Sequence, residues 1–326
     1  MQGLMQDWPL LVPSILEHAN INHPEQEVVS RAVEGPIHRY SYADLYKRAK
    51  RCAKAMTKLG VRKGDVVATL AWNTYRHMEA WYGLMGIGAV CHTLNPRLFP
   101  EQLIYIINHA EDRVLFVDLN LLPAAAKLCP QLPSVRHVVA MTDRAHIPAD
   151  VKIPNLLVYE ELIADQPGRY DWPDFDERTA SSLCYTSGTT GNPKGVLYSH
   201  RSTVLHAYGA ALPDTLGLSA RSVILPVVPM FHVNAWGLPY TAAMVGAKIV
   251  FPGVALDGAS LYELFEKEKV SFTAGVPTVW LALLQYMQAN KLKLSTVKYA
   301  VIGGSAAPPA MIETFDKDYG LSLIHI

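Results

Sequence analysis

The chain has 326 residues, of which 50% are apolar and 18% are charged, and its 29 basic and 29 acidic side chains cancel. Such a length and apolar content can fill more than one hydrophobic core, which favours two subdomains. The lack of a basic excess argues against binding to nucleic acid or to an anionic membrane surface.

The cysteines and the N-terminus indicate the compartment. The four cysteines are widely spaced and form no CxxC pair, which suits reduced thiols and disfavours a metal cluster. The segment Met1 to Pro13 has no lysine or arginine and too short an apolar run for a signal peptide. No window approaches the roughly 18 consecutive apolar residues of a membrane span. We therefore expect a soluble, cytoplasmic protein.

The first third of the chain alternates helical and strand-like segments. After a short helix and a hairpin in Ile15 to His38, a helix is predicted to start at Ser41, with Asp44 completing a capping box. We expect the basic residues of this helix, Arg48 among them, to face solvent. The alternation predicts a parallel sheet with helices on both faces. The later elements are strands at Asp65 to Trp72, Gly88 to Thr93 and Arg113 to Val117, and helices at Arg76 to Met85 and Pro100 to His109.

Prolines become frequent between Cys129 and Thr179, which predicts a strand around Val135 to Met141 followed by an irregular connection. Regular alternation then resumes and predicts a second α/β unit. Its elements are strands at Val223 to Pro226, Gly246 to Pro252, Val270 to Gly275 and Ala300 to Ile302, and helices at Ser199 to Leu212, Leu256 to Glu268 and Pro277 to Met287.

The most informative stretch, Tyr185 to Val196, reads Tyr-Thr-Ser-Gly-Thr-Thr-Gly-Asn-Pro-Lys-Gly-Val. Its glycines let backbone N–H groups approach a ligand, and Lys194 adds a compact positive charge, so the stretch suits phosphate binding. Apolar residues on both sides predict a hairpin that holds the loop on a sheet. Because Lys194 lies between a proline and a glycine, the stretch is not the common P-loop. A hairpin turn without a ligand is the alternative.

Residues 186–195 resemble the signature loop of the AMP-forming acyl-activating enzymes, which include acyl-CoA synthetases, aryl-CoA ligases, luciferases and peptide-synthetase adenylation domains. The similarity extends over nearly the whole chain and is greatest towards fatty-acyl-CoA synthetases. It implies that the loop binds the phosphates of ATP and that Thr186 is a ligand of Mg²⁺. The residues implied in nucleotide binding here are Thr186, Ser187, Gly188, Thr189, Thr190, Gly191 and Lys194.

A second segment, Pro229 to Gly237, combines aromatic residues with His232 and an asparagine, as the linings of ligand pockets often do. Taken alone, His232 is better interpreted as a core histidine with its hydrogen bonds satisfied. The resemblance instead implies that His232 is catalytic, near the carboxylate and the α-phosphate. It also implies that the adjacent Val233 binds nucleotide and that Trp236 is a gate between nucleotide and acyl tunnel.

The segment Ala300 to Pro308 predicts a strand, a glycine turn and a helix, an arrangement that can present backbone N–H groups to a ligand. By resemblance, this turn contacts the adenylate and the bottom of the acyl pocket. The residues implied are Gly303, Gly304 and Ser305.

The resemblance implies an α/β fold of two adjoining subdomains, at residues 1–180 and 181–326, the second carrying the ATP loop and the acyl pocket. It implies an ATP- and Mg²⁺-dependent ligase that activates a medium- or long-chain fatty acid as an acyl-adenylate and transfers it to CoA. An acidic partner for an amino-acid amine is missing from His232 to Gly246. An aryl- or short-chain acyl-CoA ligase and a non-catalytic nucleotide- or acyl-binding protein are the alternatives. A homodimer is also expected by resemblance.

The chain stops at Ile326, in what looks like a strand. In the family, the glutamate that binds Mg²⁺, the aspartate that binds ribose and a C-terminal domain with a lysine follow this point. We therefore expect an N-terminal fragment that lacks the C-terminal domain and is nearly inactive by itself.

Overall fold

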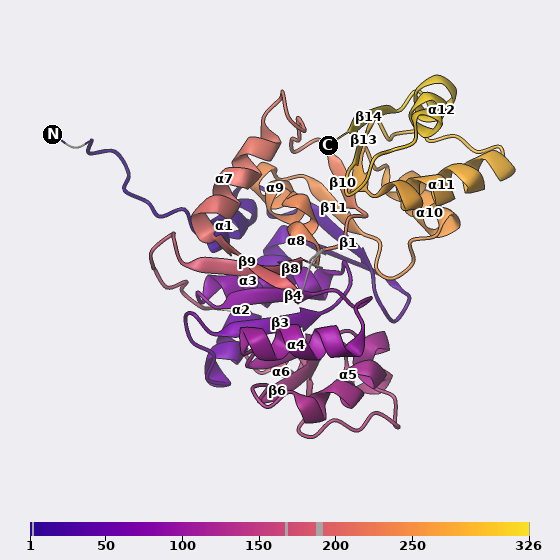
Figure 1. The fold of residues 1–326 in the computed structure, drawn as a ribbon. Helices are drawn as coiled ribbons and strands as arrows, with labels where there is room; N and C mark the ends of the chain where they lie inside the picture. The colour runs from indigo at the N-terminus through magenta and orange to yellow at the C-terminus, as the bar shows by residue number, and fades with distance from the viewer. Residues whose placement is uncertain (2, 167–168, 187–191, 326) are drawn as a thin grey trace.

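Two seven-stranded sheets form the frame of this protein (Figure 1). The structure is a computed structural model that describes residues 1, 3–166, 169–186 and 192–325. Every strand pair within the two sheets is parallel except one pair at an edge of each sheet. Most of the parallel strands are buried along most of their length, because helices cover both faces of each sheet.

The first sheet has the order β7-β6-β5-β3-β4-β8-β9. Its strands β8 and β9 form an antiparallel hairpin at one edge. The strands are β3 (Val66–Leu70), β4 (Val90–Leu94), β5 (Val114–Val117), β6 (His137–Ala140), β7 (Leu157–Val158), β8 (Ala180–Thr186) and β9 (Lys194–Ser199).

The second sheet has the order β14-β13-β12-β10-β11-β1-β2. Here the antiparallel hairpin at the edge is β1 and β2, from the start of the chain. The strands are β1 (Glu27–Arg31), β2 (Ile37–Ser41), β10 (Val223–Pro226), β11 (Lys248–Phe251), β12 (Phe272–Gly275), β13 (Tyr299–Ile302) and β14 (Ser322–His325).

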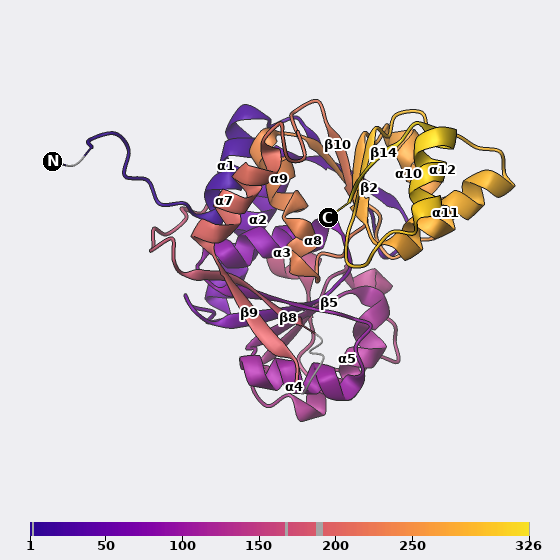
Figure 2. The ribbon, with the colours of Figure 1, turned by 45° about the horizontal axis from the view of Figure 1, so that its top comes forward.

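Helices and sheets alternate in five layers (Figures 1 and 2). One apolar cluster lies between the two sheets and includes residues of α1, α2, α3, α7 and α9; a second packs α10, α11 and α12 on the far face of the second sheet; a third packs α4 and α5 on the far face of the first sheet. The helices are α1 (Val12–Asn22), α2 (Tyr42–Lys58), α3 (Tyr75–Gly86), α4 (Pro100–Ala110), α5 (Leu122–Leu128), α6 (Tyr159–Ala164), α7 (His200–Ala211), α8 (Val233–Trp236), α9 (Leu238–Val245), α10 (Gly258–Glu268), α11 (Pro277–Ala289) and α12 (Pro309–Tyr319).

Sheet membership does not follow the predicted boundary at residue 180. The early hairpin β1–β2 pairs with β11 in the second sheet, whereas β8 and β9 pair with β4 in the first. The loop between β8 and β9 is therefore mounted on the first sheet, not on a unit that starts at residue 181. Strand pairing depends on contacts between distant segments, which local patterns along the chain do not encode.

Helix α2 starts as predicted, because the Ser41 side chain accepts a bond from the Asp44 N–H and Asp44 bonds the Ser41 N–H in return. The expectation for Arg48 is wrong. Its guanidinium turns inward and donates to Glu79, which is fully buried, at 2.7 Å, and to Glu160 at 3.0 Å. The buried carboxylate of Glu79 requires such a partner.

The connection between β6 and β8 is more regular than predicted, because it contains the short elements β7 and α6, and α5 precedes it. Their brevity explains the omission, since six or seven residues show too little periodicity to be recognised. Among the described residues, no helix combines the length and apolar composition of a membrane-spanning segment.

Candidate nucleotide and acyl site

The β8–β9 hairpin ends at the edge of the first sheet where the parallel strands have their carboxyl ends. Thr186, the last residue of β8, pairs with Lys194, the first residue of β9, and both are exposed. The Thr186 hydroxyl donates to the Lys194 carbonyl at 3.5 Å. Five residues of the predicted phosphate loop, Ser187, Gly188, Thr189, Thr190 and Gly191, lie outside the described residues. Ligands of α/β sheets characteristically bind at this edge.

A cavity of about 190 Å³ adjoins this hairpin. The hairpin and the loop after β4 supply one side, and the segment before α8 supplies the other. The cavity therefore lies between the first sheet and the turn that follows β10. Its lining residues are Asn95, Leu98, Cys184, Tyr185, Thr186, Pro193, Val196, Tyr198, His232 and Val233.

His232 borders this cavity and is exposed. Within the described part of the chain its imidazole has no hydrogen-bond partner, so it is not a core histidine with its bonds satisfied. Partial desolvation lowers the pKa of His232, which favours the neutral ring at physiological pH. A neutral imidazole at a cavity edge can donate one hydrogen bond and accept another.

The residues after His232 form a left-handed turn, labelled α8. Val233, Asn234, Ala235 and Trp236 have φ values of 46°, 51°, 51° and 54°. Left-handed backbone costs roughly 1–2 kcal/mol for each non-glycine residue, and it rarely continues beyond one residue. Strained backbone of this kind persists only where surrounding contacts impose it, and it is concentrated at functional sites.

The side chain of Asn234 anchors this turn to β8. Its amide donates to the Ser182 hydroxyl at 2.7 Å, and its carbonyl oxygen accepts from the Cys184 thiol at 3.4 Å. The turn ends at Gly237, with φ of 75°. A Cβ at Gly237 would lie 2.5 Å from the His206 ring, so both backbone and packing require glycine there.

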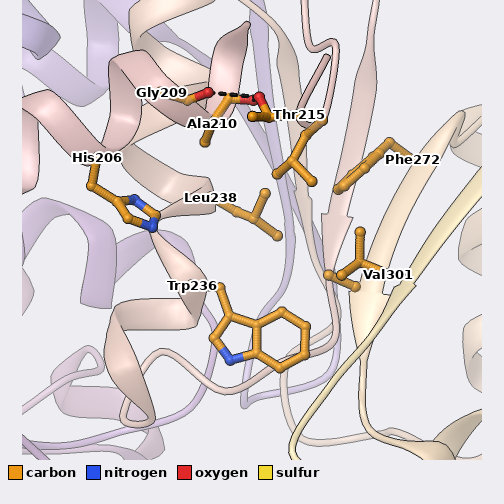
Figure 3. Close-up of a pocket in the computed structure, with 10 residues that line it drawn as sticks. His206, Gly209, Ala210, Thr215, Trp236, Leu238, Phe272 and Val301 are labelled. Carbon is orange, nitrogen blue, oxygen red and sulfur yellow. Dashed lines mark hydrogen bonds between the residues drawn. The ribbon is translucent and has the colours of Figure 1, made fainter. Parts of the chain in front are cut away.

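Trp236 lines a second cavity of about 330 Å³, which is mainly apolar. Figure 3 shows its indole on one side of the cavity, with His206 and Phe272 on other sides. The two cavities thus lie at opposite ends of the left-handed turn. The remaining lining residues are Gly209, Ala210, Thr215, Leu216, Leu238, Ala274 and Val301.

The glycine turn after β13 contacts this tryptophan. A Cβ at Gly303 would lie 2.7 Å from the Trp236 ring, so the indole packs directly on the glycine backbone. Gly304 has φ of 82°, and it and Ser305 are exposed. Because α12 begins only at Pro309, Gly304 and Ser305 lie in a loop and not at a helix N-terminus. Of the predicted site residues outside the phosphate loop, His232, Val233 and Trp236 line the cavities, Gly303 packs against Trp236, and Gly304 and Ser305 line neither cavity.

The described residues do not make a magnesium site by themselves. They contain no group of three or more His, Cys, Asp or Glu side chains arranged to hold a metal ion. Thr186 contributes one hydroxyl, whereas Mg²⁺ is usually bound by one or two carboxylates together with substrate phosphates.

Several site residues were not predicted from the sequence. Asn95 follows β4 and lines the first cavity, and Asn73 follows β3 beside the segment that leads to His232. Polar residues directly after buried parallel strands were the available signal, because those strand ends converge at one edge. Tyr185, the first residue of the signature stretch, was not predicted as a site residue but lines the first cavity. Its hydroxyl bonds His109 Nδ1 at 2.6 Å, and burial raises the pKa of Tyr185 to about 12.

Comparisons with known proteins now place the chain. The profile of a family described as AMP-binding enzyme matches residues 16–326. The chain belongs to this family. A medium-chain-fatty-acid–CoA ligase of Ectopseudomonas oleovorans is 52% identical over 325 residues, which are 100% of this chain and 59% of that protein. A 3-methylmercaptopropionyl-CoA ligase of Ruegeria lacuscaerulensis is 50% identical over 100% of this chain and 60% of its own length.

The fold is shared with solved structures. An anthranilate CoA ligase in complex with anthranoyl-AMP superposes with a TM-score of 0.86 at 24% identity, covering 97% of this chain and 60% of that one. The family and the α/β fold expected from residues 186–195 are confirmed. The AMP-binding chain spans about 60% of the length of these curated relatives.

Proposed function

We propose that this AMP-binding chain provides the nucleotide and acyl sites of an ATP-dependent acid–CoA ligase acting on medium- or long-chain fatty acids. The observation that carries the proposal is the pair of cavities joined by one left-handed turn. His232 and Val233 border the cavity beside the β8–β9 hairpin, and Trp236 borders the apolar cavity. A carboxylate that enters from the apolar side would thus meet a nucleotide held on the other.

The proposed chemistry makes one bond and breaks one bond at phosphorus. A carboxylate oxygen of the substrate attacks the α-phosphorus of ATP, and pyrophosphate leaves with the electrons of the broken bond. The protein contributes positioning and neutralisation of charge. Thr186 and Lys194, with the five loop residues between them that lie outside the description, would hold the phosphates. The His232 ring would hydrogen-bond the carboxylate or the α-phosphate.

The remaining steps are also proposals. CoA would attack the acyl-adenylate through its thiol, displace AMP and leave as the thioester. Mg²⁺ would accompany ATP, with Thr186 as one ligand. We place the reaction in the cytoplasm, because the four cysteines are unpaired thiols.

The acyl cavity supports a substrate of intermediate length. An apolar cavity of about 150 Å³ holds benzene, so the 330 Å³ beside Trp236 corresponds to roughly a dozen carbons. The 52% identity to a medium-chain ligase supports the same class. The 3-methylmercaptopropionyl-CoA ligase, at 50% identity, supports a shorter acid as the alternative. Affinities for acyl-adenylate analogues of different acyl length decide between the two.

We also propose a homodimer. The chain before α1 extends away from the body in Figures 1 and 2 and exposes Leu4, Met5 and Trp8. A separate cavity of about 570 Å³ between α1, α7 and α9 has an apolar lining that includes Tyr208 and Leu212. The arm and this cavity each present apolar surface that a second copy would remove from water.

The test measures binding by the chain itself, with sulfamoyl analogues of acyl-adenylates that cannot react. We expect the decanoyl analogue to bind, and His232→Ala to weaken that binding at least tenfold by removing a contact at the α-phosphate. Trp236→Ala should reduce the preference for the decanoyl analogue over AMP. His146→Ala, which changes an exposed histidine outside both cavities, is the matched control.

Calorimetry reports each affinity, and a thermal shift provides an independent readout, because a ligand that binds only the folded state stabilises it. Failure of the wild-type chain to bind any acyl-adenylate analogue would remove the proposal. Tighter binding of the benzoyl analogue than of the decanoyl or palmitoyl analogue would instead assign an aryl-CoA ligase.

A further inference from the structure

Asn73 joins the two sheets at the segment that leads to His232. It follows β3 at the edge of the first sheet, and only 5% of its surface is exposed. Its side-chain amide donates to the carbonyls of Pro226 and Val228, both at 2.9 Å. Its side-chain oxygen accepts from the Met230 N–H at 2.7 Å. Only an amide side chain combines two donors with an acceptor in this way.

The backbone of Asn73 also contacts the second sheet. Its carbonyl accepts a bond from the Gly253 N–H at 3.1 Å, just beyond β11. Gly253 has φ of 66°, and a Cβ there would lie 2.5 Å from the Arg31 carbonyl oxygen. The backbones of Gly253 and Arg31 are so close that only glycine fits at position 253. One residue of the first sheet thus meets the carboxyl ends of both β10 and β11.

These bonds determine the path of the chain after β10. The N–H groups of Val227 and Val228 both bond the Ala274 carbonyl, at 2.9 and 2.8 Å, on the side towards β12. Asn73 bonds the same segment from the first sheet. The segment is therefore held from two directions until Met230, two residues before His232. Beyond it, the His232 N–H bonds the Pro229 carbonyl at 3.0 Å and starts the left-handed turn.

The neighbouring Trp72 supports the same segment. Its backbone N–H donates to the buried Asp118 carboxyl at 2.7 Å, which fixes the chain at the end of β3. Its ring packs edge-on against Phe231, with ring centroids 6.4 Å apart. Phe231 lies between the last residue bonded by Asn73 and His232, so Trp72 and Asn73 together hold the entry to the turn.

We infer that Asn73 is a positioning residue for the active site. By fixing the segment from Pro226 to Met230, it sets the location of the His232 ring at the nucleotide cavity and of Trp236 at the acyl cavity. This inference rests on the proposed function for the meaning of the site, but its structural part does not. Asn73 lines neither cavity, and its effect passes through the turn.

Replacing a residue that only bonds the two sheets together would also destabilise the protein. A loss of stability alone therefore does not test the inference. The discriminating readout is the environment of His232, whose pKa is lowered by desolvation in the intact site. Histidine labelled with ¹³C at Cε1 reports each imidazole titration by NMR, and His232→Asn identifies the His232 signal by its loss.

The variants are Asn73→Ala, which removes all three side-chain bonds, and Asn73→Ser, which replaces the amide with one shorter hydroxyl and serves if the alanine variant does not fold. Thr273→Val is the matched control. It removes a buried bond of 2.7 Å to the Leu225 carbonyl on β10, away from the turn. Affinity for the decanoyl sulfamoyl adenosine is measured for each folded variant.

We expect the Asn73 variants to raise the His232 pKa towards its ordinary value of about 6.5 and to weaken analogue binding at least tenfold. Thr273→Val should lower stability but change neither quantity. An Asn73 variant that is destabilised but retains the wild-type His232 titration and affinity overturns the inference. If the wild-type chain binds no analogue, the proposed function fails, and the titration still decides whether Asn73 positions His232.

Discussion

Two fully buried histidines, His77 and His200, depend on remaining neutral. Burial lowers the pKa of each to about 4. His77 Nδ1 bonds the Trp72 carbonyl and Nε2 bonds the Thr69 hydroxyl, both at 2.9 Å, so each nitrogen has a partner suited to the neutral ring. The unfolded chain binds a proton near pH 6.5, well above the folded value. The stabilising contribution is therefore fully present above pH 6.5 and is lost as the pH falls towards 4.

The buried carboxyl of Asp118 changes the stability of the protein with pH in the opposite direction. Burial raises its pKa from 3.8 to about 7, so its carboxyl gains a proton more readily in the folded state. Its contribution is fully present below pH 3.8 and is lost as the pH rises through about 7. The pH dependence of the wild type alone therefore mixes opposing effects. A difference between variants is needed to isolate one group.

We predict that His77→Gln reduces the loss of stability on acidification. Acidification from pH 8 to pH 5 lowers the free energy of unfolding by about 2 kcal/mol for one such histidine. Glutamine gains no proton in this range, so the variant avoids that loss. Urea unfolding at the two pH values measures the free energy of unfolding of each protein. His146→Gln, at an exposed position, should leave the pH dependence unchanged. Equal pH dependence in the wild type and His77→Gln would show that His77 is not held neutral.

At the level of elements, the left-handed turn α8 conflicts most clearly with local preference. Val233 is β-branched, exposed and at φ of 46°, a combination that is rare without a constraint. The Asn234 side chain supplies part of that constraint from β8. Four consecutive left-handed residues are consistent with a turn shaped for the site and not for stability.

We predict that Val233→Gly is tolerated much better than Val196→Gly. Both valines border the nucleotide cavity and are about equally exposed, at 41% and 39%. Glycine relieves roughly 1–2 kcal/mol of left-handed strain at position 233 but only weakens the strand at position 196. Chemical unfolding of both variants gives the comparison. Equal losses of stability would mean that the turn carries no strain at Val233.

At the level of the whole molecule, the two sheets are interleaved along the chain. The hairpin β1–β2 crosses to the second sheet, and one apolar cluster includes residues of both sheets. Buried ion pairs add to this union, since Arg76 binds Glu34, from the β1–β2 connection, at 2.8 Å and Glu160, from α6, at 2.7 Å. Arginine forms several bonds in fixed geometry, which suits it to such a junction.

We predict that the proposed homodimer depends on the N-terminal arm. Sedimentation velocity should give the mass of two chains for the wild type and of one chain after deletion of residues 1–8. The loss follows because the exposed apolar side chains of the arm, such as Trp8, contribute the area removed from water. Leu281→Ser, an exposed change on α11, should leave the dimer intact. A wild-type mass of one chain would contradict the proposal.

Much of the candidate site could be predicted from the sequence, for a definite reason. The signature stretch and the segment around His232 and Trp236 are runs of consecutive residues, so their resemblance to the family could be recognised from the sequence, although composition alone favoured a core histidine at His232. Asn73 could not be recognised in this way. Its partners Pro226 and Met230 lie 153 and 157 positions away, and nothing near Asn73 announces them.

The sequence alone determined the alternation of strands and helices, the cap of α2 at Ser41 and the family, because each rests on residues within a few positions of one another. Only the tertiary structure decided which sheet each hairpin joins, why Arg48 turns inward to Glu79, and how His232 and Trp236 come to lie at two different cavities. These outcomes depend on burial and pairing summed over the whole molecule, and no short window of the chain contains that sum.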